Sequence, residues 1–329
     1  FYVNVHNQAS YGVTIHWHGV KQPRNPWSDG PENITQCPIQ PGTNFTYTVV
    51  LSNEEGTLWW HAHNDWTRAT VHGPIVVLPP NNTYHKMVAP YEYQTIVLGS
   101  WYKGDPRQIA LDNYNAGTDP PASDGYTING QPGDLYECSN DTTYSLTVDS
   151  GKKYMLRVIN SVVNEEMWFG VANHKLTVVG QDGAYVQPFS TDYIMITPGQ
   201  TMDVTITANN TPSYYYMAAS PFVDFSLDPY SNTTTTAILM YSGNISRPAS
   251  IPLPVLPSAT DDSAASAFTS LIKSMDSYGH PFDIPQTINQ DLLITISTNF
   301  LPCTSPACST FFALAASTNN VSFVTKPVS

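Results

Sequence analysis

Thr14-Ile15-His16-Trp17-His18-Gly19 and Trp59-Trp60-His61-Ala62-His63 are the two stretches that decide the fold and the chemistry of this chain. Each contains a His-x-His tripeptide. Successive side chains of a β-strand point to opposite faces, so the two imidazoles of each tripeptide share one face of a strand. If the two strands lie side by side, four neutral imidazoles converge on a small volume. Imidazole binds zinc, copper, iron and nickel well, so we predict a metal site at these four histidines.

Two His-x-His tripeptides so close together carry more weight than either alone. A single His-x-His is weak support for a metal site, because such short motifs also arise where histidines simply contact solvent. Here four of the nine histidines fall in the two tripeptides, among aromatic and β-branched neighbours. That concentration favours a metal site over two solvated strand ends.

The composition of the chain limits its partners. At 329 residues the chain is long enough for two domains, each with its own core. Asp and Glu outnumber Lys and Arg by 26 to 13, which gives a net charge of −13. This charge argues against nucleic acid or an anionic membrane surface as a partner. No apolar run approaches the roughly 20 residues that cross a bilayer, so we expect no membrane partner.

The residue pattern is that of an all-β protein. Short runs rich in Val, Ile, Thr, Tyr and Phe alternate with Pro, Gly, Asn and Asp. Strands are predicted at 45–51, 74–78, 95–99, 144–148, 154–160, 168–179, 193–197, 202–207, 214–218, 236–241 and 292–297. An Ala-rich segment at 261–274 predicts one short helix. Regular strand spacing with turn signals indicates Greek-key sandwiches or barrels.

Turn-rich segments divide the chain into domains. Pro79-Pro80-Asn81-Asn82 ends a first domain at residues 1–82. A second domain is predicted at 90–245, followed by a Pro-punctuated linker at 246–290. Residues 291–329 are too few for another domain of this size. They either add strands to what precedes them or open a third domain that is absent here.

Asn-x-Ser/Thr sequons indicate a secreted glycoprotein. A sequon arises by chance about once per hundred-odd residues, whereas this chain has eight. They begin at Asn33, Asn44, Asn81, Asn140, Asn209, Asn232, Asn244 and Asn320. Four cysteines are compatible with disulfides in an extracellular setting. No signal peptide is visible, because residues 1–5 already have the pattern of a strand, and we expect the chain to begin inside a domain.

Several motifs occur in a fixed order along the chain. Those of the first domain are Gly12-Val-Thr-Ile-His-Trp-His-Gly-Val20, Trp27-Ser-Asp-Gly-Pro31, Thr35-Gln-Cys-Pro-Ile39 and Gly56-Thr-Leu-Trp-Trp-His-Ala-His63. Together they resemble the multicopper oxidases, and most closely the plant laccases. Other stretches resemble the second domain of that family or the opening of its third: Asn129-Gly-Gln-Pro-Gly-Asp134, Leu156-Arg-Val-Ile-Asn160, Asn164-Glu-Glu166, Ala172-Asn-His-Lys-Leu-Thr-Val-Val179 and Ala315-Ala-Ser-Thr-Asn-Asn-Val-Ser-Phe323. The histidine motifs are the most specific part of the resemblance.

The resemblance implies a fold and a chemistry. The family folds as tandem cupredoxin-like Greek-key β-sandwich domains, three in all. A mononuclear (type 1) copper in the third domain takes electrons one at a time from a substrate such as a phenol. A Cys-His route passes them to a three-copper cluster between the first and third domains, where dioxygen is reduced to water. The implied partners are dioxygen and a small phenol, and the implied setting is the plant apoplast, with lignin degradation as a role.

The resemblance also assigns roles to individual residues. His16 resembles the ligand of the lone (type 2) copper of the cluster. His18 and His61 resemble ligands of one copper of the coupled (type 3) pair, and His63 resembles a ligand of the other. Asp29 resembles a carboxylate that assists proton delivery during oxygen reduction, a role that a carboxylate near bound water can perform. Read without the resemblance, Asp29 is an ordinary turn residue before a Gly-Pro pair.

The chain also departs from the family pattern. The third and fourth His-x-His motifs of the family are not in these 329 residues, and no cysteine has a histidine neighbour. A type 1 copper needs a thiolate among histidines, so we expect that site to be absent from this chain. The other histidines are isolated and are expected to be structural or exposed: His6, His72, His85, His174 and His280.

The cysteines also match only part of the family pattern. In the family, the counterparts of Cys37 and Cys138 form disulfides with cysteines that lie outside this sequence. Cys303 and Cys308 resemble the local disulfide pair of plant laccases. Two orphaned and two paired cysteines are what we expect of a piece of a larger chain, or of a product truncated at both ends.

Two hypotheses follow for the function. In the first, the chain is most of the first two domains of a laccase, and activity belongs to the complete protein. In the second, it is a non-catalytic copper-binding or merely structural β-sandwich protein. A third interpretation, another multicopper oxidase such as an ascorbate oxidase, stays open because the shared motifs do not define the substrate pocket. We predict that this chain alone neither oxidises phenols nor shows the blue absorbance of a copper–thiolate centre.

Overall fold

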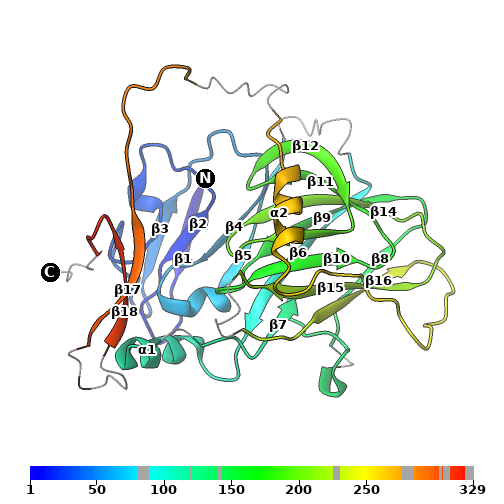
Figure 1. The fold of residues 1–329 in the computed structure, drawn as a ribbon, viewed down its shortest axis with the longest axis horizontal. Helices are drawn as coiled ribbons and strands as arrows, with labels where there is room; N and C mark the ends of the chain where they lie inside the picture. The colour runs from blue at the N-terminus through cyan, green and yellow to red at the C-terminus, as the bar shows by residue number, and fades with distance from the viewer. Residues whose placement is uncertain are drawn as a thin grey trace.

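The computed structural model describes residues 1–79, 89–118, 121–139, 142–224, 230–275, 285–303, 306 and 312–322. Within these residues the protein is built almost wholly of β-strands, with two α-helices and a few 3-10 turns. The predicted all-β class is therefore confirmed. Figure 1 shows an N-terminal sandwich beside a larger second sandwich. No helix in the described part is both long and apolar enough to cross a membrane.

The first sandwich has five strands in two small sheets. One sheet pairs β1 with β3, and the other has the order β2-β4-β5. The strands are β1 (Tyr2–His6), β2 (Ile15–His18), β3 (Asn44–Thr48), β4 (Gly56–Ala62) and β5 (His72–Val77). Two 3-10 turns, η1 (Pro26–Ser28) and η2 (Asp65–Ala69), lie in the connections.

The alternation of β2 is what presents its histidines. Ile15 and Trp17 are buried in the first core against Tyr47 and Leu58. His16 and His18 alternate with them and are only half-buried on the opposite face. Burial of the apolar face thus fixes the register of the strand and turns both imidazoles outward from the core.

The second sandwich contains most of the remaining strands. Its six-stranded sheet has the order β12-β11-β14-β9-β6-β7, and its five-stranded sheet has the order β13-β10-β15-β16-β8. The strands are β6 (Glu92–Trp101), β7 (Gly125–Ile128), β8 (Ser145–Val148), β9 (Lys153–Asn160), β10 (Glu166–Val171), β11 (Leu176–Gln181), β12 (Ala184–Thr191), β13 (Tyr193–Ile196), β14 (Thr201–Thr207), β15 (Tyr214–Phe222) and β16 (Thr235–Tyr241), with a 3-10 turn η4 (Glu137–Ser139). Trp168 and Phe169 on β10 are both fully buried in the hydrophobic core of this sandwich.

The two sandwiches are joined through a buried polar cluster. The guanidinium of Arg157 on β9 donates hydrogen bonds to the carboxylate of Asp203 on β14 at 3.2 Å and to the hydroxyl of Thr57 on β4 at 2.9 Å. The Thr57 hydroxyl in turn donates to Asp203. β9 and β14 are buried along nearly their whole length, because β4 of the first sandwich covers the outer face of their sheet.

Two helices lie at the edges. Helix α2 (Asp262–Leu271) confirms the predicted helix and buries Phe268 in the second core. Helix α1 (Pro106–Ala116) was not predicted, although Asp105 caps its first turn by accepting a hydrogen bond from the Arg107 amide. This Asp-Pro start was the available signal.

The predicted linker is partly packed on the second sandwich. The amide of Tyr216 donates to the carbonyl of Pro252 at 3.0 Å, and the amide of Val223 donates to that of Ala259 at 2.7 Å. Residues 252–259 therefore reach β15 on either side of its pairing with β10, pass against Trp168 and Gly170 of β10, and lead into α2. The predicted domain boundaries themselves remain predictions.

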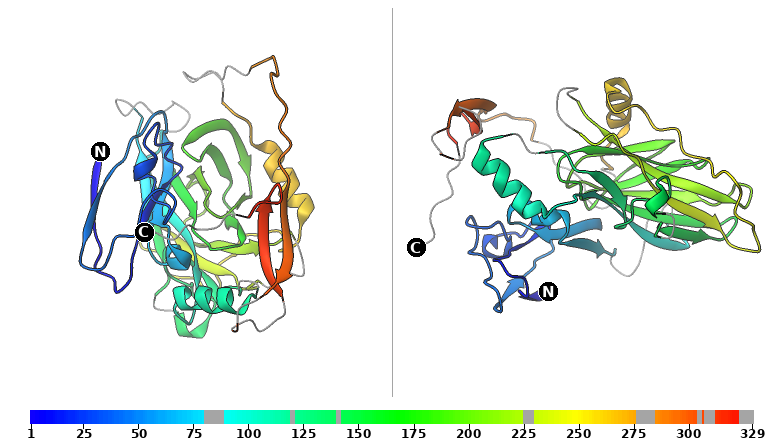
Figure 2. Two further views of the ribbon diagram at one scale, coloured as in Figure 1. Left: turned by 90° about the vertical axis from the view of Figure 1, so that its left-hand side faces the viewer. Right: turned by 90° about the horizontal axis from the view of Figure 1, so that it is seen from below.

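The last described element is a hairpin of β17 (Ile296–Pro302) and β18 (Phe312–Thr318). Its apolar side chains are exposed, including Ile296 at 81% and Phe300 at 64% of their surface. In Figure 2 α1 lies between this hairpin and the first sandwich in both views.

Candidate metal centre

The pairing of β2 with β4 brings the two His-x-His tripeptides together. The strands are antiparallel, with His16 directly opposite His61 and His18 opposite Trp59. Directly opposed residues of an antiparallel pair project from the same face of the sheet. The amide of His63, one residue beyond β4, still donates to the carbonyl of Thr14 at 3.0 Å. All four histidines therefore sit along one short ladder.

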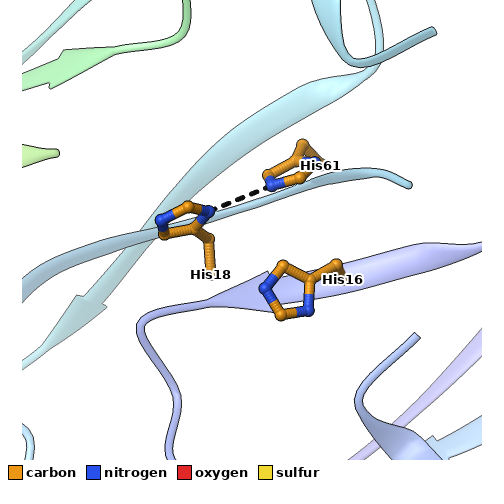
Figure 3. Close-up of side chains that lie close together, drawn as sticks. All are labelled: His16, His18 and His61. Carbon is orange, nitrogen blue, oxygen red and sulfur yellow. Dashed lines mark hydrogen bonds between the residues drawn. The ribbon is translucent and has the colours of Figure 1, made fainter. Parts of the chain in front are cut away.

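The imidazoles converge as the strand pattern predicts. Ring nitrogens of His16, His18 and His61 all lie within 4.8 Å of one another. Figure 3 shows the three rings gathered beside the two strands. Nδ1 of His18 lies 3.2 Å from Nε2 of His61. The ring centre of His63 lies 5.3 Å from that of His16 and 5.7 Å from that of His61. The four rings line a cavity of about 370 Å³.

Backbone carbonyls orient two of the rings. Nδ1 of His16 lies 2.7 Å from the carbonyl oxygen of Asp29, and Nδ1 of His61 lies 2.9 Å from that of Ala62. A carbonyl only accepts, so both Nδ1 atoms carry the hydrogen and both Nε2 atoms carry a lone pair, which in His61 faces Nδ1 of His18. A hydrogen bond of this kind fixes the tautomer and the direction of a metal-binding imidazole.

Burial favours the neutral form of His18, His61 and His63. Burial, reinforced by the neighbouring imidazoles, lowers the pKa of His18 to about 4. Burial likewise lowers the pKa of His61 to about 3, against the opposing hydrogen bond to Ala62. The pKa of His63 is lowered as well, first by burial and then by His16. A neutral imidazole is the form that binds a metal, so the site is prepared for one at neutral pH.

Asp29 lies beside the site. Its Oδ1 atom is 3.4 Å from Nδ1 of His16, in addition to the contact made by its carbonyl. The next residue, Gly30, has a φ of +101°, and a Cβ there would stand 1.9 Å from the carbonyl oxygen of Ile15. Only glycine allows this approach, which holds the Asp29 loop against β2. Asp29 therefore lies in a turn and also has its carboxylate next to His16, so the two interpretations of this residue are compatible. Its role in proton delivery remains a prediction.

Several residues of the cavity wall were not predicted. Arg68, on η2, lines the cavity and donates from its guanidinium to the carbonyl of Val163 at 2.7 Å. Its charge contributes to the lowered pKa of His18 and His63. Pro198 and Gly199 line the same cavity from the second sandwich. Arg68 follows His63 closely in the sequence, whereas nothing in the local sequence connects Pro198 and Gly199 with the histidines, so no pattern would have found those two.

Among the described residues, His6, His72 and His174 are not in the three-histidine group that could hold a metal, although His72 on β5 lies directly opposite His61. His174 is buried in the second sandwich, with Nδ1 at 2.7 Å from the Ala172 carbonyl and Nε2 at 2.9 Å from the Tyr241 hydroxyl. His72 is held by the carbonyl of Arg68, and His6 is exposed on β1. His85 and His280 lie outside the described residues.

The structure describes some of the cysteines and most of the sequon asparagines. Cys37 is free and exposed, and Cys303 is disulfide-bonded. Its predicted partner Cys308 and the side chain of Cys138 lie outside the described residues, so the pairing stays a prediction. Among the sequon asparagines, Asn33 is half-buried, and Asn81 and Asn140 lie outside the described residues. The exposed ones are Asn44, Asn209, Asn232, Asn244 and Asn320.

The donor set fits copper. It consists of neutral imidazoles with free lone pairs, and no cysteine lines the cavity among the described residues. Imidazole ligands suit copper, zinc, iron and nickel, so the geometry alone does not select one metal.

Family models described as multicopper oxidase match two parts of the chain, residues 1–82 and residues 92–244. Curated relatives match nearly all of it. Laccase-14 of Arabidopsis thaliana is 45% identical over 99% of this chain and 57% of its own length. Laccase-21 of Oryza sativa subsp. japonica is 46% identical over 99% of this chain and 59% of its own length. The chain thus spans well under two thirds of these relatives.

Solved structures agree on the fold. The laccase from Botrytis aclada has a TM-score of 0.73 and 26% identity, over 97% of this chain and 56% of that one. Fet3p, described as a multicopper oxidase that functions in iron import, has a TM-score of 0.73 and 20% identity, over 98% of this chain and 57% of that one. The second likeness bears on fold alone, and it supports the predicted cupredoxin-like sandwiches.

Proposed function

This chain belongs to the multicopper oxidase family, and on that premise we propose that His16, His18, His61 and His63 hold copper in a laccase-type oxidase. The activity is the one-electron oxidation of phenols coupled to the reduction of dioxygen to water. The observation that carries the proposal is the cluster itself: three imidazoles from two paired strands, with ring nitrogens within 4.8 Å of one another. Copper bound there would supply one-electron redox chemistry that no side chain has.

We assign the roles of the ligands as the resemblance implies. His16 belongs to the type 2 copper, His18 and His61 to one type 3 copper, and His63 to the other. The short distance of 3.2 Å between Nδ1 of His18 and Nε2 of His61 supports a shared metal for that pair. The separate orientation of His16 by the Asp29 carbonyl supports a distinct role for His16.

The protein residues have three tasks in this proposal. Burial keeps His18 and His61 unprotonated, so their lone pairs stay available as the pH falls. The carbonyl groups of Asp29 and Ala62 hold two rings in one orientation, which lowers the reorganisation needed on metal binding. The carboxylate of Asp29, 3.4 Å from His16, is placed to hold or release a proton beside the cavity.

These 329 residues contain four of the imidazoles that the family site uses and no cysteine next to a histidine. We therefore keep a second candidate function, a copper-binding sandwich protein without oxidase activity. In both cases the chain by itself is expected to bind copper through nitrogen and to lack the blue absorbance of a copper–thiolate centre.

One preparation tests what both proposals expect of this chain. The 329-residue chain is loaded with copper, freed of excess metal, and examined for copper content, electron paramagnetic resonance and oxidation of a simple diphenol. We expect bound copper with nitrogen hyperfine structure and no turnover. Turnover would show that this chain is an oxidase as it stands, and absence of bound copper would remove the metal site itself.

We further propose that the protein is secreted and glycosylated in the plant apoplast. Five of its eight sequon asparagines are exposed, which leaves room for a glycan at each. Treatment of the protein, expressed through a plant secretory pathway, with an endoglycosidase should increase its electrophoretic mobility. An unchanged mobility would contradict this proposal.

A further inference from the structure

One wall of the metal site comes from the second sandwich. Thr197-Pro198-Gly199-Gln200 forms a tight turn between β13 and β14, closed by a hydrogen bond of 3.0 Å from the Gln200 amide to the Thr197 carbonyl. Gly199 has a φ of +86°, the backbone conformation that the third position of a type II turn requires. The turn therefore has one defined shape.

The turn is fixed firmly to its own sandwich. The amide of Gly199 donates to the carbonyl of Asn160 at 2.9 Å, and the Asn160 amide donates to the Gln200 carbonyl at 3.1 Å. The Asn160 side chain is fully buried and donates to the carbonyl of Ile196 at 2.8 Å. Such buried, satisfied hydrogen bonds leave the turn little freedom to move.

The turn contacts the first sandwich at the metal site. The indole N–H of Trp59 donates to the Gly199 carbonyl at 2.9 Å. A Cβ on Gly199 would stand 2.7 Å from Cε1 and 3.0 Å from Nε2 of His18. Gly199 thus lies against the Nε2 edge of the His18 ring, while Nδ1 on the other edge faces His61. The ring of Trp59, 5.2 Å from that of His18 between centres, covers another side.

We infer that Gly199 is a positioning residue for His18: the second sandwich holds this imidazole with Nδ1 turned toward His61, and the site binds metal tightly only while that wall is in place. This inference rests on the proposed copper-binding function. His18 differs in this from His16 and His61, whose Nδ1 atoms are fixed by carbonyls of the first sandwich. No backbone carbonyl is seen to hold His18 among the described contacts; its ring lies between His61 and Trp59 of the first sandwich and Gly199 of the second.

The test compares two glycine variants of the 329-residue chain. Gly199→Ala introduces a methyl group that displaces the His18 ring. Gly151→Ala is the matched control, because Gly151 has a similar φ of +79° but nothing within 4 Å of the position of its Cβ. Both variants carry the same backbone strain, so we expect similar losses in melting temperature. Only Gly199→Ala is expected to weaken copper binding, by about tenfold or more, which is the range for loss of ligand orientation.

Two measurements give the answer. Copper(II) affinity is measured by competition with a chelator, and the His18 Hε1 proton resonance is followed in metal-free protein. We expect the resonance to shift in Gly199→Ala and to stay in place in Gly151→Ala. Equal copper affinities in the two variants would overturn the inference. If the unaltered chain binds no copper, the proposed function fails. The inference about Gly199 is tested separately in metal-free protein, where an unshifted His18 resonance in Gly199→Ala would overturn it.

A second pair of variants tests the hydrogen bond to the turn. Trp59→Phe removes the N–H that binds the Gly199 carbonyl and keeps an aromatic ring beside His18. Trp60→Phe is the control, since Trp60 is the next residue on β4 and projects from the opposite face, against Gly73. We expect weaker copper binding in Trp59→Phe than in Trp60→Phe. Equal copper affinities in Trp59→Phe and Trp60→Phe would show that the hydrogen bond from Trp59 is not needed to hold the turn, and would count against the inference.

Discussion

His16 on β2 and His61 on β4 are direct partners in an antiparallel ladder, and each ring donates its Nδ1 hydrogen to a main-chain carbonyl. Both Nε2 atoms therefore carry a lone pair, and that of His61 faces Nδ1 of His18 at 3.2 Å. A short stretch of sheet thus places two ligands and fixes their tautomers, before any metal is bound.

Replacing His61 with alanine should weaken copper binding most clearly. His61 is buried, and its Nε2 faces Nδ1 of His18 at 3.2 Å, so its loss removes a ligand from the centre of the cluster. We expect the affinity of the 329-residue chain for copper(II) to fall at least about tenfold. His6→Ala is the control, because His6 is exposed on β1 and has no place in the cluster. Chelator competition measures both, and equal affinities would contradict the ligand role.

Copper binding should tolerate mild acid. The pKa of His18 is about 4 and that of His61 is about 3 in the metal-free protein, so protons compete for these two nitrogens only at low pH. Ordinary histidines have a pKa of about 6.5 and would be protonated much earlier. We therefore expect His18 and His61 to cause no loss of copper affinity between about pH 7 and pH 5, and a steep loss near about pH 4.

The measurement is a series of chelator competitions at decreasing pH. A His16→Ala/His63→Ala variant serves as the background, because it leaves the His18–His61 pair as the remaining proposed ligands. A steep decline already between about pH 7 and pH 6 in this background would show that the pair is protonated there, against the burial that the structure gives it.

The sequence predicts the site better than it predicts the surroundings of the site. Period-two alternation in a strand is local, so His16 and His18 could be assigned to one face from the sequence alone. The register that sets His16 opposite His61 depends on the packing of Trp17 and Leu58 in a shared core, which no local pattern encodes. The wall at Gly199 depends on the docking of a second sandwich and was beyond the sequence for the same reason.

Breaking the cluster that joins the two sandwiches should be costly. Asp203→Ala would leave the buried guanidinium of Arg157 without its carboxylate partner, and an uncompensated buried charge costs about 3–5 kcal/mol. The control is Asp192→Ala, which breaks an exposed ion pair with Lys175 and should cost less than about 1 kcal/mol. Urea denaturation followed by tryptophan fluorescence gives both free energies of unfolding. Similar losses in the free energy of unfolding for the two variants would mean that other groups stabilise the charge of Arg157 when Asp203 is removed.

Acid should destabilise the second sandwich through His174. Burial lowers its pKa below the ordinary value of 6.5, so the folded state prefers the neutral ring that the unfolded state readily protonates. The contribution of His174 is complete above the unfolded pKa of about 6.5 and is lost as the pH falls toward the folded pKa. His174→Gln cannot ionise, so its melting temperature should decline less between about pH 7 and pH 5.

The comparison with unaltered protein isolates this one histidine, because the other buried histidines are present in both chains. His6→Gln, on the exposed surface, should follow the unaltered protein at every pH. If His174→Gln loses stability as fast as the unaltered chain, protonation of His174 is not linked to unfolding.

Errors in the predicted strands have physical causes. The stretch 168–179 reads as one apolar run, but the structure divides it into β10 and β11 around Asn173, whose φ is +59°. Both strands are buried on two faces, and a buried run shows no alternation that would reveal the break. The strand predicted at 292–297 begins at Ile296 instead, because pairing with β18 rather than side-chain preference decides its start.

The order of the elements along the chain has a consequence for how the protein matures. A ribosome makes β2 and β4 well before the turn at residues 197–200, and N-terminal units generally fold first. In a nascent chain that has released only the first sandwich, the carbonyls that orient His16 and His61 are already present, while the contact of His18 with Gly199 is still missing. On the inference above, the site reaches its final geometry only when the second sandwich has folded against the first.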